Sequence, residues 1–273
     1  MAGINIEKYH GGTEAKAVLR HCDKDRRVSD SHTNSQINKS LTAGNRQYAL
    51  KGSKSDYASV SKEYDERIAK IDQKALKTPR KDRVTLVGME LPRPENLPPE
   101  QFKAWSEDAV KTIMRFYPSG CLLAAYSHVD EVHDYKKMNE DTQKVLTIKS
   151  REHVHVFLTP YSETGESLNA KEFTSRKNLI ELNRLVNEMS VEKYGVAFCN
   201  GSGRKSKKSV EDLKSESRAL EQSENARLRE ENKRLKAENE HLRDMLNKQA
   251  VQSARERADA DIDYSGYDST LSL

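Results

Sequence analysis

Cysteine is scarce in this chain of 273 residues: there are three, far apart at positions 22, 121 and 199. So few and so scattered cysteines exclude a disulfide framework and a zinc ribbon, and we expect a cytoplasmic protein. Long apolar runs are missing as well. None approaches the roughly 18 residues that cross a bilayer, which excludes a membrane-spanning helix, and the N-terminus lacks the apolar core of a secretory signal.

Apolar residues make up only 35% of the chain, whereas 33% of the residues are charged. That apolar fraction is low for one compact domain, so we expect a core domain plus polar segments that bury little. The 47 basic and 43 acidic residues leave a net charge of +4, but they are unevenly distributed. Basic residues cluster at 23–27, 77–83 and 203–208, and these clusters point to a polyanionic partner.

The first 200 residues have the pattern of a folded α+β domain. We expect strands at 83–91, 121–129 and 152–160, and helices from about 100 to 117 and from about 170 to 194. Two or three central strands with long helices on one face would form an α+β sandwich.

Beyond residue 200 the composition changes. We expect a basic linker at 201–212, a leucine-repeat helix at 213–248 and an acidic, disordered tail at 249–273. The helix has leucines at 213 and 220, and then at 228, 235 and 242. The step from 220 to 228 is eight, so the first two leucines are out of register with the others.

The later leucines predict a coiled coil. With Leu228, Leu235 and Leu242 at d, Asn232 and Asn239 occupy a positions. Leucine at d with asparagine at a is typical of a parallel two-stranded coiled coil, so we expect a homodimer. The alternative is a lone solvated helix, because three heptads are near the minimum for this assignment.

Two of the histidines have a spacing that indicates a metal site. Alternation along the strand 152–160 puts His153 and His155 on one face, with aliphatic residues on the other. Their imidazoles can both reach one divalent ion at ~2.1 Å. His128, at the end of the preceding apolar strand, can supply a third ligand, although His133 competes for that place. Three neutral ligands leave the ion its full charge and open positions, which suits polarisation of a phosphate.

Five segments occur in the order of known motifs: LRHCDKDR (19–26), HTNSQINKS (32–40), HVDE (128–131), HVHVFLTP (153–160) and SLNAKEFTSRKNLIELN (167–183). Together they resemble the Pre/Mob plasmid relaxases, also called the MobV-type family, which belong to the wider HUH group of single-strand endonucleases. Each motif alone is weak, but five in order are specific. The resemblance implies an antiparallel-sheet, HUH relaxase-like catalytic domain over residues 1–200, followed by a coiled-coil helix.

The resemblance also implies an activity. Such an enzyme nicks the origin of transfer of plasmid DNA, single-stranded or in a hairpin, keeps the 5′ phosphate in a covalent bond, and reseals the strand. A histidine nucleophile is largely neutral at cell pH, and its imidazole can attack phosphorus directly. Because the adduct keeps much of the free energy of the diester, the 3′ hydroxyl can reverse the reaction without ATP.

The resemblance implies a role for particular residues. His21 is the nucleophile, and Glu131 accepts its proton or orients it. The ligands of Mn²⁺ or Mg²⁺ are His128, His153 and His155. We expect contacts to DNA from Arg26, Asn34, Asn38 and Arg46.

The chain departs from the family pattern in three places. Cys22 follows the nucleophile where asparagine is usual, and Lys24 replaces an arginine, for which Arg26 or Arg27 can compensate. The third departure is an insertion of 21 residues, 132–152, between Glu131 and the His-x-His motif. We expect a β-hairpin that lengthens the two ligand-bearing strands to absorb it.

Other nucleophiles are weaker candidates. Tyrosine serves in most other HUH enzymes, but we interpret Tyr48, Tyr57 and Tyr64 as packing or DNA-stacking residues. A Cys22 thiol nucleophile is disfavoured, because adjacent residues rarely point into one site. A different class of function also fits: a non-enzymatic dimeric DNA-binding protein or autorepressor, in which the basic residues at 204–208 lead into the leucine repeat.

Overall fold

The computed structural model describes residues 3–29, 37–48, 56–75, 78–118, 120–139, 142, 144–162, 164–199 and 210–267. Its strands are β1 (Asn5–His10), β2 (Arg46–Tyr48), β3 (Val84–Pro92), β4 (Leu122–His128), β5 (Asp134–Met138), β6 (Val145–Lys149) and β7 (His153–Leu158). The α-helices are α1 (Gly11–Cys22), α2 (Lys24–Val28), α3 (Tyr57–Lys74), α4 (Phe102–Phe116), α5 (Ala170–Phe173), α6 (Arg176–Tyr194) and α7 (Val210–Tyr267). Short 3-10 helices are η1 (Lys39–Gly44) and η2 (Pro99–Gln101).

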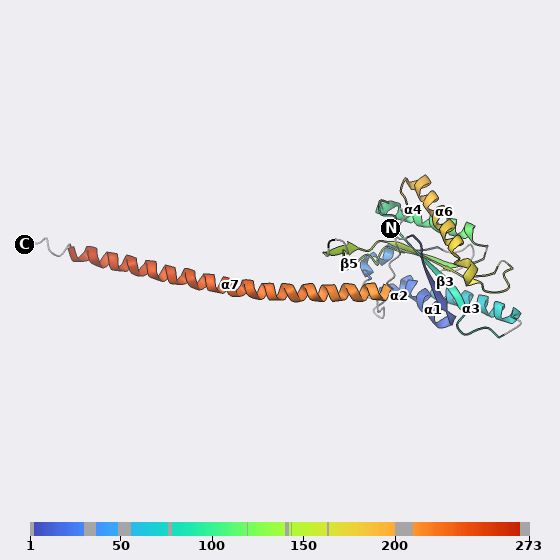
Figure 1. Ribbon diagram of the computed structural model, residues 1–273, viewed down its shortest axis with the longest axis horizontal. Coiled ribbons are helices and arrows are strands. Elements are labelled where there is room, and N and C mark those ends of the chain that lie inside the picture. The colour runs from blue at the N-terminus through green and yellow to red at the C-terminus, as the bar shows by residue number, and fades with distance from the viewer. Residues whose placement is uncertain are drawn as a thin grey trace, which may run out of the picture. The chain divides into compact units, whose positions relative to one another are not determined.

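The central element is a sheet crossed by β3 (Figure 1), and its strands are in the order β1-β3-β7-β4-β2. Every pair of neighbours in it is antiparallel, as expected for the fold class. The sheet has five strands among the described residues, more than the two or three that we predicted. Sequence patterning missed β1 and β2 because β1 is mostly exposed and polar and β2 spans three residues.

Helices cover both faces of the sheet, so the predicted arrangement with helices on one face is wrong. One core joins Val154, Val156 and Leu158 of β7 to Trp105 of α4 and Val186 of α6. The second core, on the opposite face, joins residues of β4 and β7 to α1 and α3: Ala15, Leu19, Val60, Tyr64, Tyr126 and Phe157. Alternate side chains of β7 therefore pack into the two cores on opposite faces of the sheet.

Two helix boundaries differ from the predictions. The helix expected at 170–194 is divided into α5 and α6, because Ser175 interrupts it and accepts a hydrogen bond from the backbone N of Asn178 at 3.2 Å. α7 continues to Tyr267, so residues 249–267, which we assigned to a disordered tail, are helical. Within the described residues, no helix has the length and apolarity needed to span a bilayer.

The chain divides into two compact units. The first contains residues 1–135 and 148–207, and the second contains residues 136–147 and 208–273. The second unit joins most of the insertion to the C-terminal helix, whereas our predicted boundary at residue 200 placed the insertion with the catalytic domain. β5 and β6 form a separate two-stranded sheet, so the insertion is a hairpin, as expected, but it does not extend the main sheet.

Candidate active site

Strand pairing brings three histidines together. In the antiparallel pair of β4 and β7, His128 lies opposite His153, and Tyr126 lies opposite His155. Residues directly opposite each other project to the same face of a sheet. The ring centroids of the three histidines are accordingly 4.8 to 5.3 Å apart. This pairing confirms that the strand ending in His128 lies beside the strand that carries the His-x-His motif.

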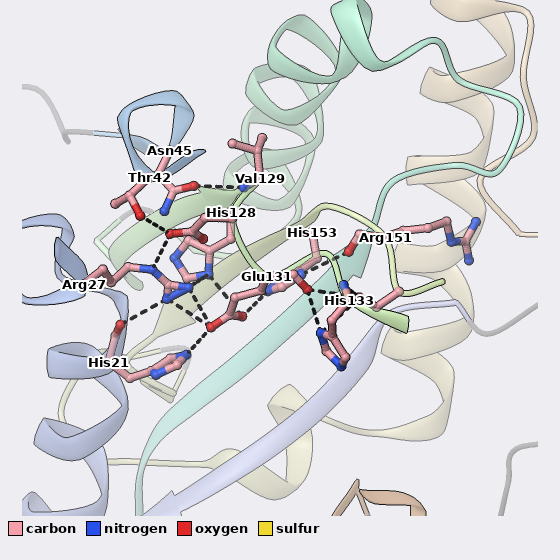
Figure 2. A network of polar contacts seen from close by, with 12 residues as sticks. His21, Arg27, Thr42, Asn45, His128, Val129, Glu131, His133, Arg151 and His153 are labelled. Carbon is pink, nitrogen blue, oxygen red and sulfur yellow. Dashed lines mark hydrogen bonds and ion pairs between the residues drawn. The ribbon is translucent and has the colours of Figure 1, made fainter. Parts of the chain in front are cut away.

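Glu131 reaches the histidines because the chain leaves the strand path just beyond them. β4 ends at His128, and the ladder of the insertion hairpin starts where Ser150 N donates to the carbonyl of His133, at 2.8 Å. In the intervening segment, the Glu131 carboxylate turns toward the rings (Figure 2). Its Oε2 lies 3.2 Å from His153 Nε2 and 3.8 Å from His128 Nδ1.

These four side chains are suited to hold one metal ion. One ligand atom from each of His128, Glu131, His153 and His155 lies within 4.8 Å of the others, close to the spacing that bonds of ~2.1 Å to a shared ion require. His128 Nε2 is buried and has no hydrogen-bond partner in the described part of the chain. Buried polar atoms almost always have a partner, and a bound cation would supply one. Imidazole and carboxylate ligands together suit a divalent metal.

Burial keeps two of the imidazoles neutral, which is the metal-binding form. It lowers the pKa of His128 to about 4, and burial together with the neighbouring rings lowers the pKa of His155 well below its usual value. Burial also opposes protonation of His153, but its bond to Glu131 outweighs this and raises its pKa. For Glu131, burial alone would raise the pKa; the bonds from the histidines and Arg27 instead hold it well below its usual range. Glu131 is therefore an anion.

His21 approaches the same carboxylate from another element. It lies in the last turn of α1, whose buried residues pack on the face of the sheet that also bears Phe157. His21 Nε2 is 3.0 Å from Glu131 Oε1. Glu131 thus bonds His21 through one oxygen and His153 through the other. The His21 side chain is 32% exposed, so its ring remains accessible from solvent.

Arg27 is part of this site, although the sequence offered it only as an alternative to Arg26 for replacing the arginine missing at position 24. Its guanidinium is fully buried and lies 2.6 Å from Glu131 Oε1, and its Nε donates to Asp130 Oδ2 at 3.2 Å. It also donates to the backbone carbonyl of His21, at 3.3 Å. Arg27 therefore ties the α1–α2 connection to the segment that holds Glu131. A signal was present in retrospect: Arg27 lies one helical turn after Lys24, the position where the family has arginine.

Three of the four predicted DNA-contacting residues belong to segments next to this centre. Arg26 is half-buried, one position before the buried Arg27, and Arg46 is exposed on β2, opposite Ser127. Asn38 is exposed; its side chain accepts hydrogen bonds from Ser40, and its backbone N donates to the carbonyl of Asp130 at 2.8 Å. Asn34 lies outside the described residues. The DNA contacts of these four residues stay predictions.

His133 and the tyrosines do not join the centre. His133 Nδ1 lies 3.1 Å from the Glu131 carbonyl, and its ring points away from the other histidines (Figure 2). Tyr64 is buried in the core and donates to Thr85 Oγ1 at 2.8 Å, and Tyr48 donates to Ser127 Oγ at 3.2 Å. Cys22 is buried, and burial raises the pKa of its thiol, which keeps it protonated. Of the two candidates for the third imidazole ligand, the structure brings His128 to the other two.

The sheet and its histidine site have the architecture of an HUH-type relaxase domain, the class that the sequence motifs resemble. Comparison with protein-family models matches residues 3–215 to Mob_Pre, described as plasmid recombination enzyme. The chain therefore belongs to this enzyme family, which confirms the resemblance seen in the sequence. A comparison with curated proteins found no significant match.

Solved structures of the MobM relaxase domain (MOBV; Mob_Pre) share the fold. One, a Mn-bound crystal structure at pH 6.8 with plasmid pMV158 oriT DNA of 22 nucleotides and a 3′-thiophosphate, has a TM-score of 0.56 and 18% identity, over 78% of this chain and 98% of that chain. Another, Mn-bound with 23 nucleotides at pH 6.5, has a TM-score of 0.54 and 16% identity, over 80% and 98%. Similarity at this level of identity shows the fold.

Proposed function

We propose that this chain is a metal-dependent relaxase, which nicks one strand at a plasmid origin of transfer and rejoins it for plasmid mobilisation or recombination. The main support is the position of Glu131, bonded to His21 on one side and adjacent to three clustered histidines on the other. Family membership and the Mn-bound, oriT-bound structures with the same fold agree with this proposal. The carboxylate links a candidate nucleophile to a candidate metal site.

In the proposed reaction, His21 is the nucleophile and the metal ligands are His128, His153 and His155, with Glu131 beside them. A bound Mn²⁺ or Mg²⁺ would withdraw charge from the nonbridging oxygens of the scissile phosphate. A ring nitrogen of His21 forms a bond to phosphorus, and the bond from phosphorus to the 3′ oxygen breaks. The electron pair of that bond stays on the 3′ oxygen, which takes a proton from solvent and becomes the 3′ hydroxyl. Glu131 accepts the proton from the His21 ring or stabilises its positive charge. The reverse reaction consumes the adduct and reseals the strand.

The activity is tested with purified protein and supercoiled plasmid that carries its cognate origin. In the presence of Mn²⁺ we expect relaxed product and a protein–DNA adduct that survives denaturing electrophoresis. Chelation by EDTA is expected to abolish both, and added Mn²⁺ to restore them. Failure to relax this plasmid with Mn²⁺ present would contradict the proposal.

The metal site is tested by binding rather than activity. His155→Ala removes one of the clustered imidazoles and is expected to weaken Mn²⁺ binding, measured by calorimetry, at least about 100-fold, since even changes outside the ligand set cost roughly 10- to 100-fold. His133→Ala is the matched control, because His133 is nearby but outside the cluster. Equal losses in both variants would argue against the assigned ligands.

The second candidate, a dimeric autorepressor that binds DNA through residues 204–208, makes a different prediction. Those residues lie outside the described part of the structure. Deletion of residues 204–273 is expected to leave origin binding intact in the relaxase, because the recognition surface lies in the first 200 residues. Loss of binding on deletion would favour the autorepressor. In both cases binding should weaken with salt, by ~0.7 to 0.9 log units per phosphate contact for each log unit of salt.

We also propose that α7 binds a second copy of the chain. Leu228, Leu235 and Leu242 are 43% to 51% exposed in the described structure, on a helix with asparagine at a positions. With these leucines at d, glutamates 231 and 238 occupy g, and Lys236 and Arg243 occupy e. In a parallel, in-register pair, each g residue meets the e residue of the next heptad on the partner, so opposite charges pair. An antiparallel pair would bring glutamates together.

A further inference from the structure

The insertion hairpin contacts α7. The backbone N of Lys136 in β5 donates to Ser217 Oγ at 2.9 Å, and the ammonium of Lys136 lies 2.9 Å from Glu224 Oε2. The same ammonium donates to Thr147 Oγ1 of β6, at 3.0 Å. Lys136 is therefore held by its own hairpin while it bonds two positions on the helix, seven residues apart.

The contact lies on one face of α7. Among the residues of this helix whose side chains are described, all are exposed except Glu216, Ser217, Leu220 and Glu224. Spacings of three and four residues put Ser217, Leu220 and Glu224 on a common face. Ser217 is 7% exposed, although most of the described side chains of this helix are polar and exposed.

This face is not the predicted dimer seam. In the heptad frame set by the leucine at 228, Ser217 and Glu224 fall at g and Leu220 falls at c. Leu220 is half-buried, whereas the leucines of the later repeat are at least 43% exposed. The step of eight between Leu220 and Leu228 marks the change from one face to the other. Leu220 thus lies on the hairpin face, and the later leucines lie on the predicted dimer seam.

We propose that the insertion hairpin is a docking site, within the same chain, for the segment of α7 from Ser217 to Glu224, and that it leaves the helix from Asn225 onward to the second copy. Glu224 would otherwise be the first g residue of the seam, where its partner in a parallel dimer is Arg229 of the second copy. In this structure the Glu224 carboxylate instead forms an ion pair with Lys136 of the same chain. The insertion therefore sets the position at which the coiled coil begins.

The hairpin is also continuous with the candidate active site. β5 follows the strand that ends in His128, and β6 precedes the strand that carries His153 and His155. Docking at Lys136 thus fastens the helix to the insertion that interrupts the metal-ligand motifs. The docking of the helix on the hairpin is independent of the proposed dimer and of the DNA chemistry. Only the assignment of the helix from Asn225 onward to a second copy rests on the proposed dimer.

Zero-length cross-linking with a carbodiimide tests the docking in the full chain. The reagent joins an amine to a carboxylate only when the two are in contact, so we expect a cross-linked peptide containing Lys136 and Glu224. Cross-linking a mixture of ¹⁵N-labelled and unlabelled protein distinguishes the two possible origins, after native mass spectrometry has shown that mixed dimers form. Peptides that are wholly light or wholly heavy support docking within one chain. Absence of the peptide, or a mainly mixed product, overturns it.

A charge reversal provides the second measurement. Lys136→Glu is expected to speed hydrogen exchange of the amides in residues 213–224 about fivefold, because a partly exposed ion pair of modest strength is replaced by a repulsion. Adding Glu224→Lys should restore protection by exchanging the two charges. Lys137→Glu is the matched control: Lys137 is the next residue, exposed, and on the other face of the strand. Equal exchange in Lys136→Glu and Lys137→Glu would contradict the proposal.

Discussion

His21→Ala protein is expected to form no covalent adduct with origin DNA and to bind that DNA with nearly unchanged affinity. The reason for the first result is the loss of the attacking nitrogen, a change that lowers the turnover of other covalent enzymes by about 10⁶-fold. The second result follows because affinity for DNA comes chiefly from many phosphate contacts. The single His21 imidazole supplies few of them. Adduct is measured on denaturing gels and binding by fluorescence anisotropy.

Tyr48→Phe is the control for the nucleophile. Its hydroxyl donates to Ser127 Oγ, so the substitution removes one hydrogen bond and leaves the aromatic ring in place. The adduct should form at close to the normal rate. An adduct that persists in His21→Ala and disappears in Tyr48→Phe would transfer the nucleophile to tyrosine.

The histidine site was predictable from the sequence because it depends on short-range rules. Alternation in a strand places His153 and His155 on one face, and a strand ending at His128 needs only to pair beside them. The structure adds the register that puts His128 opposite His153. It also places His128, rather than His133, beside the other two histidines, because the chain departs from the strand path between residues 128 and 133.

Other features depend on tertiary contacts that no local pattern reports. Arg27 is one of two adjacent arginines in a charged segment, and only the packing of α2 decides which of them is buried. The same limit applies to the short polar strand β2, which is stabilised by pairing with the buried β4. Leu220 was recognisable as out of register, but no pattern in the sequence indicated the hairpin that contacts the same helix face: Lys136, which bonds Ser217, lies 81 residues before that serine.

Arg27→Met is expected to be the most destabilising single substitution at the site. The side chain is 0% exposed and bonds both Asp130 and Glu131, of which Asp130 is also fully buried. Thr42 Oγ1 donates to the same Asp130 oxygen, at 2.7 Å, but it carries no charge. Removing one partner of a buried ion pair costs about 3 to 5 kcal/mol, because the remaining charge has no compensation.

Urea unfolding followed by the fluorescence of Trp105 measures this cost. Trp105 is the only tryptophan in the chain and is buried in the core between α4 and the sheet, so its signal reports on the catalytic domain and not on α7. Arg26→Met is the matched control; Arg26 is half-buried, and we expect a change within about 0.5 kcal/mol. Similar free energies of unfolding for the two variants would show that the Arg27 pairs contribute little.

Arg27→Lys separates charge from geometry. Lysine keeps the positive charge but lacks the planar group through which arginine bonds two carboxylates and the His21 carbonyl at once. We expect this variant to recover part of the lost stability and yet to form adduct more slowly than the wild type, because Glu131 and His21 are no longer held by a common side chain. Full recovery of both properties would mean that Arg27 serves only as a counter-charge. Recovery of stability alone would identify it as the residue that positions the carboxylate against the nucleophile.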